Sequence, residues 1–445
     1  MAAGRATRAA RFLYALGGDD GSSAGAYATT EAAPVDPFGA LGDWFEVPTG
    51  LPAATTLAKV ARVGHFLYLV GGDDGAGPVA TVSRAEVLDP ALAPTVTDLS
   101  ARRGMGMGLG AGVWIYRISA VFPATDPQNP DGESLASDPV PVRLPTGLPD
   151  VLRITLDWSE VPGASGYRVY RSPTADAALG AEQLVAEVSA RSYEDDGYED
   201  DGSDPIDTRA PLPLGSHGAW AAMASLNTPR AGFGLAQALD PVDPTVHYLY
   251  ALGGRSDTGA LLASYEFLRV QVVGPRGHAV AAAWTDGATD LPAARAELAA
   301  YAVDNYAAPV VTAPTTYVYA ANGQGATGAV VDVDVGEVQA GGQLTSWSSV
   351  RSGRNVSGYA SAAGNGFLYV FGGGPTATTS SFSAQLCDGT AGCAGPPLVR
   401  NWNNEGVSLT VPRYLPGSDT ESSFIFIVGG TSGTGALAST EQTVL

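Results

Sequence analysis

The sequence predicts an all-β fold built from repeats of about 50 residues. Three observations lead to this prediction: a seven-residue aromatic pattern that recurs along the chain, tryptophans that recur at one phase of it, and 57 glycines among 445 residues. Glycine that falls at regular intervals is typical of a turn-rich β protein, whereas glycine without a period is typical of disorder.

The seven-residue pattern has aromatic residues at its first and third positions and ends in Gly-Gly or Asn-Gly. It occurs at Phe12–Gly18, Phe66–Gly72, Tyr248–Gly254, Tyr317–Gly323, Phe367–Gly373 and Phe424–Gly430. Such a run predicts a buried strand that ends in a turn with positive φ. We therefore expect structural roles for Gly17, Gly18, Gly71, Gly72, Gly253, Gly254, Gly372, Gly373, Gly429 and Gly430.

Each repeat has room for four strands. A tryptophan marks the fourth strand in five repeats, at Trp44, Trp220, Trp284, Trp347 and Trp402. An arginine then heads the next repeat in four cases, at Arg230, Arg295, Arg354 and Arg413. Four-stranded repeats of this length are typical of β-propeller blades, so the sequence predicts a propeller of six blades. The sixth repeat stops before any tryptophan strand, so either the N-terminal segment completes the last blade or that blade keeps three strands.

The glycine turns, tryptophans and arginines together resemble the Kelch repeat. The resemblance implies structural roles for these tryptophans and arginines, with each guanidinium stacked beside a tryptophan and bonded to carbonyl groups of the next blade. Binding of a substrate anion is the alternative role for the arginines. Asn322 replaces the first glycine in the fourth repeat, and asparagine tolerates the left-handed conformation.

The spacing of the turns reveals an insertion, because Gly71 and Gly253 are much farther apart than other successive turns. An outer strand at 85–90 and the strand at Trp220 flank the extra residues. We therefore expect propeller at 1–90, an insert at 91–217 in the loop between strands three and four of the second blade, and propeller again at 218–445.

The insert has a strand pattern of its own. Two strands are expected at 113–122 and 138–144, a hairpin at 154–172, and one more strand at 182–197. The region around Trp158 and Tyr167 resembles a fibronectin type III domain, which implies a β-sandwich. The pattern of that family's last strands precedes the pattern of its early strands, so the insert is either a permuted domain or parts of two.

The formal net charge of −21 argues against nucleic acid and anionic membranes as partners, because phosphate binding requires clustered Lys or Arg. Lys59 is the only lysine, and no apolar run is long enough to span a membrane. The first residues contain no apolar signal-peptide core, so either the protein is not exported by a cleaved signal or a leader is missing from this sequence.

Acidic loops are the main candidates for binding. Asp19 and Asp20 follow the first glycine turn, Asp73 and Asp74 follow the second, and the third turn is followed by Arg255 and Asp257. The carboxylate pairs suit Ca²⁺ or a cationic group, but Asp-Gly is also ordinary turn chemistry.

A second acidic run lies at the end of the insert. It contains Asp195, Asp196, Asp200 and Asp201, which would form either a calcium-rigidified hinge or a solvated linker. Calcium is the only cofactor that the sequence suggests.

Cysteine and histidine offer little chemistry. Cys387 and Cys393 are spaced for a small local disulfide, or they are two free thiols. His65 and His247 occupy equivalent places in two repeats, so we expect structural roles. An oxidase with a copper-bound Tyr–Cys pair is disfavoured, because both cysteines lie in one loop without a nearby histidine.

No nucleophilic triad, phosphate loop or zinc-protease motif occurs at a usable spacing. We therefore predict a non-enzymatic binding or structural protein of a cell surface or virion, with protein or glycan partners. The alternative is a carbohydrate-active oxidase or isomerase with its site on the face that carries the Gly-Gly loops. An intracellular adaptor of Kelch type is a weaker alternative.

Overall fold

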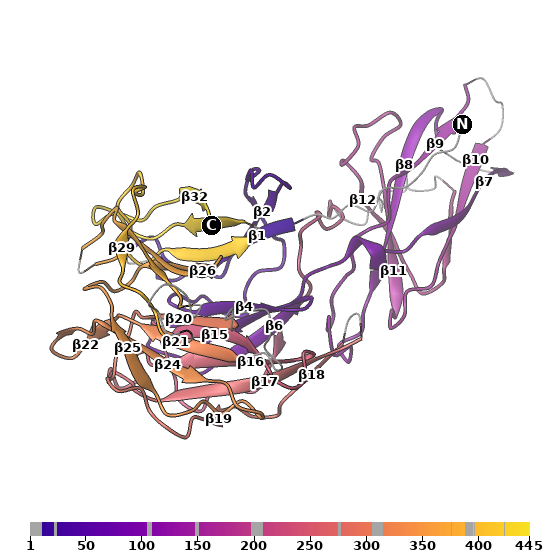
Figure 1. The fold of residues 1–445 in the computed structure, drawn as a ribbon. Helices are drawn as coiled ribbons and strands as arrows, with labels where there is room; N and C mark the ends of the chain where they lie inside the picture. Colours follow the sequence, from indigo (N-terminus) through magenta and orange to yellow (C-terminus); the bar gives the residue numbers. More distant parts are fainter. Residues whose placement is uncertain are drawn as a thin grey trace. The chain divides into compact units, whose positions relative to one another are not determined.

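A computed structural model describes residues 11–21, 25–104, 109–146, 151–196, 208–274, 277–304, 315–374, 376–387, 395, 397–421 and 423–445 (Figure 1). The fold is all-β, and a short 3-10 helix at Pro90–Leu92 is the only helix in these ranges. The chain divides into two compact units. The first comprises Met1–Glu46, Gly50–Arg84 and Ala222–Leu445, and the second comprises Val47–Thr49 and Ala85–Ala221.

The first unit contains six main antiparallel sheets in the described ranges, and none of them closes into a barrel. We number them in chain order. The first sheet has β1 (Arg11–Leu16), β2 (Thr30–Val35) and β3 (Phe45–Glu46). The second sheet has β4 (Lys59–Val63), β5 (Phe66–Val70), β6 (Val82–Glu86) and β14 (Ala221–Ala222). The third sheet has β15 (Gly234–Leu239), β16 (Val246–Leu252), β17 (Tyr265–Val273), β18 (Gly277–Val280) and β19 (Thr285–Asp286).

The remaining three sheets follow the same order of strands. The fourth sheet has β20 (Ala299–Asp304), β21 (Thr316–Ala321), β24 (Asp332–Glu337) and β25 (Ser348–Ser352), and a separate two-stranded ribbon of β22 (Gln324–Gly325) and β23 (Gly328–Ala329) connects β21 to β24. The fifth sheet has β26 (Ala360–Gly364), β27 (Phe367–Phe371), β28 (Ser381–Gln385) and β29 (Asn403–Asn404). The sixth sheet has β30 (Gly417–Glu421), β31 (Phe424–Val428) and β32 (Thr440–Val444).

The seven-residue pattern forms one strand of every sheet: β1, β5, β16, β21, β27 and β31. Burial is deepest in β5, where all five residues are buried. Both glycines at the end of each pattern have positive φ, and Asn322 takes the same conformation with φ of 51°. A Cβ on Gly71 would lie 2.8 Å from the carbonyl oxygen of Arg230, so the close approach of another chain segment also requires glycine there.

Successive sheets share apolar cores. Leu249 of the third sheet packs with Tyr68 of the second, and the same relation continues from sheet to sheet up to the sixth. Leu13 of the first sheet packs with Phe426 of the sixth. The first and second sheets are joined by the hydrogen bond that the Gly18 N–H donates to the Thr55 carbonyl at 2.8 Å. Five of the junctions between sheets are therefore shared apolar cores, and the first and second sheets are linked by this loop contact.

A tryptophan stands directly before the short outer strand of five sheets. Trp44 precedes β3, Trp220 precedes β14, Trp284 precedes β19, Trp347 precedes β25 and Trp402 precedes β29. The sixth sheet has three strands, in the order β30-β31-β32. Residues 1–10, which were expected either to complete the last blade or to lie outside it, fall outside the described ranges.

The second unit has two antiparallel sheets around one core. One sheet has the order β13-β10-β7 and the other has the order β12-β11-β8-β9. The strands are β7 (Val96–Gly104), β8 (Gly112–Val121), β9 (Val140–Leu144), β10 (Val151–Trp158), β11 (Gly166–Arg171), β12 (Gln183–Val188) and β13 (Ser192–Asp195). Trp114, Ile154 and Val169 come from different strands and belong to the same core, so the second unit is one packed body.

The expected hairpin at 154–172 is wrong. β10 pairs with β13 and β7, whereas β11 pairs with β12 and β8, so the two strands lie in different sheets. Trp158 and Tyr167 meet edge to face across the core, with ring centroids 5.5 Å apart. The alternating pattern looks the same whether two strands share a sheet or face each other, because in both cases alternate residues point into the core. The single strand expected at 182–197 is likewise two strands, β12 and β13, in different sheets.

Candidate functional site

Three of the four repeat arginines are buried, and each is bonded to a carboxylate and to backbone carbonyls. Arg230 donates through Nε to Glu266 at 2.8 Å and through Nη1 to the carbonyls of Gly253 and Ser264, both at 2.9 Å. Arg295 contacts Asp334 and Arg413 contacts Glu441, at the equivalent places of the fourth and sixth sheets. The carbonyl contacts agree with the structural role that we expected, and the partner carboxylates add charge neutralisation that the sequence did not predict.

Arg354 departs from that arrangement. In the other repeats the arginine carbonyl accepts a hydrogen bond from the second glycine of a turn, but here Gly323 donates to Val356 at 3.3 Å. The guanidinium of Arg354 lies 4.1 Å from the ring centroid of Phe382, so its aromatic partner is phenylalanine and not the expected tryptophan. Phe382 lies opposite Asn404 of β29 in the fifth sheet, just as Glu266 lies opposite Asp286 of β19 in the third sheet. An aromatic ring has therefore replaced the carboxylate.

Five sheets begin with an edge strand that we call the innermost strand: β4, β15, β20, β26 and β30. A series of backbone segments just before these strands joins the five sheets. In each segment, the residue two positions before the innermost strand has positive φ. We call these five residues the hub: Leu57, Gly232, Glu297, Gly358 and Leu415. Backbone N–H groups of Gly232, Glu297, Gly358 and Leu415 each donate to the carbonyl of the preceding hub member, over 2.6 to 3.4 Å. The hub thus ties successive sheets together through their main chains.

Glu297 is the only acidic member of the hub, and its carboxylate is held from one side. Oε2 accepts hydrogen bonds from the hydroxyl of Ser357 at 2.9 Å and from that of Tyr414 at 2.6 Å. Burial and this bond to Glu297 raise the pKa of Tyr414 to about 12, although Arg255 acts in the opposite direction. A Cβ on Gly358 would lie 2.4 Å from the ring of Tyr414, so glycine is needed where the ring crosses the hub. Glu297, Ser357 and Tyr414 form the polar centre of this site.

The Gly-Gly loops surround the hub. For four of the five hub members, the residue before the hub member forms an isolated bridge with the residue that follows a glycine turn: Thr56 with Asp73, Ala231 with Arg255, Ala296 with Gln324 and Tyr414 with Thr431. The predicted binding residues Asp73 and Arg255 are thereby brought to the hub. Asp257 lies in the same loop as Arg255 and is exposed.

The paired aspartates are occupied by turn contacts. Asp19 Oδ1 accepts from the Gly21 N–H at 2.9 Å, and Asp73 Oδ1 accepts from the Gly75 N–H at 2.8 Å. Asp74 accepts from two further backbone N–H groups, and Asp20 accepts from the hydroxyl of Tyr27 at 2.7 Å. These contacts match the alternative of ordinary turn chemistry. In the described residues, no three His, Cys, Asp or Glu side chains are placed to hold a metal ion together.

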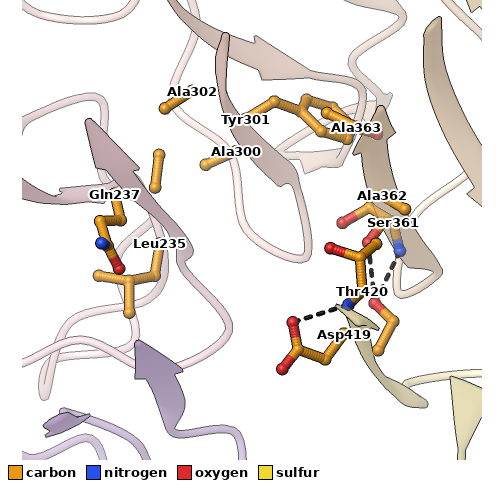
Figure 2. Close-up of a pocket in the computed structure, with 12 residues that line it drawn as sticks. Leu235, Gln237, Ala300, Tyr301, Ala302, Ser361, Ala362, Ala363, Asp419 and Thr420 are labelled. Atoms are coloured by element: carbon orange, nitrogen blue, oxygen red, sulfur yellow. Dashed lines mark hydrogen bonds between the residues drawn. The ribbon is translucent and has the colours of Figure 1, made fainter. Parts of the chain in front are cut away.

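A cavity of about 250 Å³ lies beyond the hub, among the innermost strands of the third to sixth sheets. Figure 2 shows Leu235 and Gln237 on one side and Asp419 and Thr420 on the other. Most of the remaining lining consists of alanine and serine. Asp419 is the only charged residue of this lining in the described chain.

The expected calcium hinge is wrong at Asp195. This residue is the last of β13, it is buried, and it accepts hydrogen bonds from Tyr116 at 2.5 Å and from Arg171 at 3.0 Å. Its charge is therefore neutralised inside the second unit and does not lie in a solvated linker. Asp196 lies 4.0 Å from Arg153, while Asp200 and Asp201 fall outside the described residues.

The remaining predicted residues lie apart from the hub. Cys387 is buried and disulfide-bonded, and Cys393, its expected partner, falls outside the described residues. His247 on β16 lies 3.2 Å from Gln237, ring nitrogen to amide nitrogen, and His65 is exposed. No helix of the described chain has the length and apolar character that a membrane crossing requires.

Sequence reasoning missed the three residues at the polar centre. One signal was present: Glu297 follows its repeat arginine by two residues, where Gly232 stands after Arg230. A charged residue at a place that favours glycine implies a reason other than backbone conformation. Ser357 and Tyr414 carry no such signal, because loops from different sheets bring them to Glu297.

Comparisons with known proteins provide no functional assignment. No protein-family model matches the chain, and no curated protein matches it. Among solved structures, the chain is similar to one described as the structure of YjhT, with a TM-score of 0.40 and 11% identity over 98% of this chain and 92% of that one. A likeness this weak supports no argument about function, so the proposals below depend on the contacts described above.

Proposed function

We propose that the first unit is a six-bladed, Kelch-like β-propeller and that the whole chain is a non-enzymatic binding protein. Three observations support the architecture: the six sheets with their strands in one order, the cores that successive sheets share, and the contact between Leu13 and Phe426 that joins the last sheet to the first. The residues at the hub support the function.

The second unit is proposed to be a fibronectin type III-like module in permuted form. Its sheets of three and four strands enclose one core, as in a β-sandwich. β8 and β9 resemble the last strands of a fibronectin type III domain, yet they come before β10 and β11 in the chain. In the structure β8 and β9 lie in the same sheet as β11. The module would supply a second binding surface, and a cell-surface or virion assembly is the setting that suits both units.

The single observation that carries the binding proposal is the chemistry of the hub. A carboxylate, the aromatic ring of Tyr414 and two exposed apolar side chains, Leu57 and Leu415 at 36% and 37%, come together at one end of the innermost strands. Glycans offer vicinal hydroxyl groups for a carboxylate and an apolar ring face for an aromatic side chain. Glu297 uses Oε2 for both of its hydrogen bonds, and no donor to Oε1 is found among the described residues. We therefore propose a neutral glycan as the ligand of the hub.

The test is a glycan array followed by titration calorimetry on the full chain. Glu297→Gln should weaken binding at least tenfold, which corresponds to about 1.4 kcal/mol. Glu31→Gln is the matched control, since it removes an exposed carboxylate from β2, outside the hub and its loops, and should leave affinity unchanged. Equal affinities of the Glu297→Gln variant and the parent would overturn the assignment.

A carbohydrate-active enzyme is the second candidate, and the meeting of Glu297, Tyr414 and Arg255 is the observation that favours it. Glu297 would serve as a base and Tyr414 as an acid. A general acid works best when its pKa is near the working pH, and the pKa of Tyr414 is about 12. This mismatch makes us prefer binding. Exchange of sugar ring protons with solvent, catalysed by the parent and abolished in Tyr414→Phe, would decide for the enzyme.

A further inference from the structure

Lys59 is the only lysine of the chain, and it lies at the hub end of an innermost strand. It is the first residue of β4 and follows the hub member Leu57 by two positions. In the register of the second sheet it lies opposite Val70, and the turn at Gly71 and Gly72 follows directly. The amine is therefore carried by the end of β4 that meets the Gly-Gly loops.

The side chain of Lys59 lies on the apolar side of β4. Successive residues of a strand point to opposite sides, so Lys59 shares one side with Ala61 and Val63. Val63 and Ala61 pack in the core between the second and third sheets, and Leu235 of β15 packs against the same core. Leu235 also lines the cavity of about 250 Å³. Lys59 itself is half-buried, so its side chain passes from an apolar core to a point that solvent can reach.

No carboxylate neutralises this amine in the part of the chain that the structure describes. Among the described residues, Lys59 makes no hydrogen bond and no ion pair. The carboxylates of the adjoining loops have other partners, since Asp19 accepts from the hydroxyl of Thr56 at 2.8 Å and Asp73 accepts from the Gly75 N–H. Lys59 thus differs from the buried repeat arginines, each of which has an acidic partner.

An amine in apolar surroundings without a counter-ion is disfavoured in its charged form. Burial accordingly lowers the pKa of Lys59. This weakens Lys59 as a binding group for anions and strengthens it as a nucleophile, because only the neutral amine has a free electron pair. Aldehydes are a fitting class of ligand, since a neutral lysine amine condenses with a carbonyl group to form an imine.

We propose that Lys59 is a covalent attachment site for small aldehydes, including the open-chain form of reducing sugars. The electron pair of Nζ attacks the carbonyl carbon, and the two amine protons leave with the carbonyl oxygen as water. A C=N bond remains, so one amine and one aldehyde give one imine and one water. The step needs no oxidant, reductant or metal. It goes beyond glycan recognition at the hub, because it requires neither Glu297 nor Tyr414.

The experiment uses the full chain with glycolaldehyde as the probe and cyanoborohydride as the reductant, which converts the imine into a stable secondary amine. Peptide mapping by mass spectrometry gives the rate of labelling at neutral pH. The control variant combines Lys59→Met with Arg143→Lys, which moves the only lysine to an exposed position on β9. Labelling of Lys59 in the parent should be at least about tenfold faster than labelling of the new lysine in the control, because a larger share of the buried amine is neutral.

Two results would overturn the proposal. Equal or slower labelling of Lys59 would show that its amine is an ordinary ammonium group or is closed to the aldehyde. A clear loss of unfolding free energy in Lys59→Met, measured by urea unfolding, would show that the amine serves the fold. We expect no such loss, since methionine fills a similar volume without burying a charge.

Discussion

The buried arginine sites and the hub both place charge inside the first unit, but they differ in how much of that charge the protein itself neutralises. Arg230 has its guanidinium bonded to Glu266, two carbonyls and the hydroxyl of Ser264. Within the part of the chain that the structure describes, Glu297 receives two hydrogen bonds on one oxygen and none on the other. A charge with complete internal contacts stabilises the fold, and a charge with contacts on one side only is available to a ligand.

The largest effect should come from breaking a complete site. Arg230→Ala would leave Glu266 buried without its cation, and removal of one partner from such a pair typically costs about 3–5 kcal/mol of unfolding free energy. Urea unfolding of the full chain, followed by circular dichroism, measures the loss. Arg255→Ala is the control, because Arg255 lies on the ligand side of the comparison and its removal should change stability by less than about 0.5 kcal/mol.

A double substitution sharpens this result. Arg230→Met combined with Glu266→Met removes both charges and keeps the volume, so the loss should be clearly smaller than for Arg230→Ala. If the double variant were less stable than the single one, the carbonyl contacts of Arg230 would matter more than the ion pair.

The next effect concerns the backbone of the hub. Gly358 has φ of 57°, and an added Cβ would lie 2.4 Å from the ring of Tyr414. Gly358→Ala should therefore cost about 2 kcal/mol through backbone strain and displacement of the ring. Gly75→Ala is a matched control, because Gly75 has φ of 90° but open space around it. Its loss of unfolding free energy therefore reports backbone strain alone. Equal losses in the two variants would show that Tyr414 does not press on the hub.

These contrasts show what the sequence could predict. The all-β class, the repeated strands and the positive φ at the glycine turns follow from local patterns, because aromatic strands and glycine turns keep the same spacing wherever they recur. The partition of strands between the two sheets of the second unit could not be predicted, since Trp158 and Tyr167 show the same alternation in a hairpin or across a core. The polar centre was missed because it is assembled from separate loops.

The aspartates of the Gly-Gly loops are the opposite case, because they stand out in the sequence more than Glu297 does. Asp19 and Asp73 are prominent in the sequence, and each accepts a bond from a backbone N–H of its own turn through Oδ1, while Asp19 Oδ2 also accepts from the hydroxyl of Thr56. Glu297 is a single acidic residue in an ordinary stretch, and only its neighbours in space make it a candidate. Residue type can therefore nominate a site, but only the spatial neighbours of a charge show which other groups meet it there.

A smaller effect on stability should separate the hub members by role. Leu57 and Glu297 both hold positive φ, and glycine adopts that conformation without a steric penalty. Leu57→Gly and Glu297→Gly should each change the unfolding free energy by less than about 1 kcal/mol. Glu297→Gly should abolish glycan binding, whereas Leu57→Gly removes one of two apolar side chains at the hub and should only weaken it. A loss of stability in Glu297→Gly as large as that in Arg230→Ala would place Glu297 with the structural charges.

The smallest effect is a local titration at the edge of the second and third sheets. Burial, together with the charges of Arg84, His247 and His65, lowers the pKa of His278 to about 4. Tyr68 lies 2.7 Å from Nδ1 and can donate to the neutral ring. A depressed histidine pKa contributes stability that is present above the unfolded value of about 6.5 and is lost as the pH falls towards 4. Proton NMR of the His278 ring should therefore give a midpoint near 4, and Arg84→Leu should raise it because one repelling charge is removed. A midpoint at the ordinary value in the parent would show that the ring is solvated and that this edge, unlike the arginine sites, leaves its titrating group open to water.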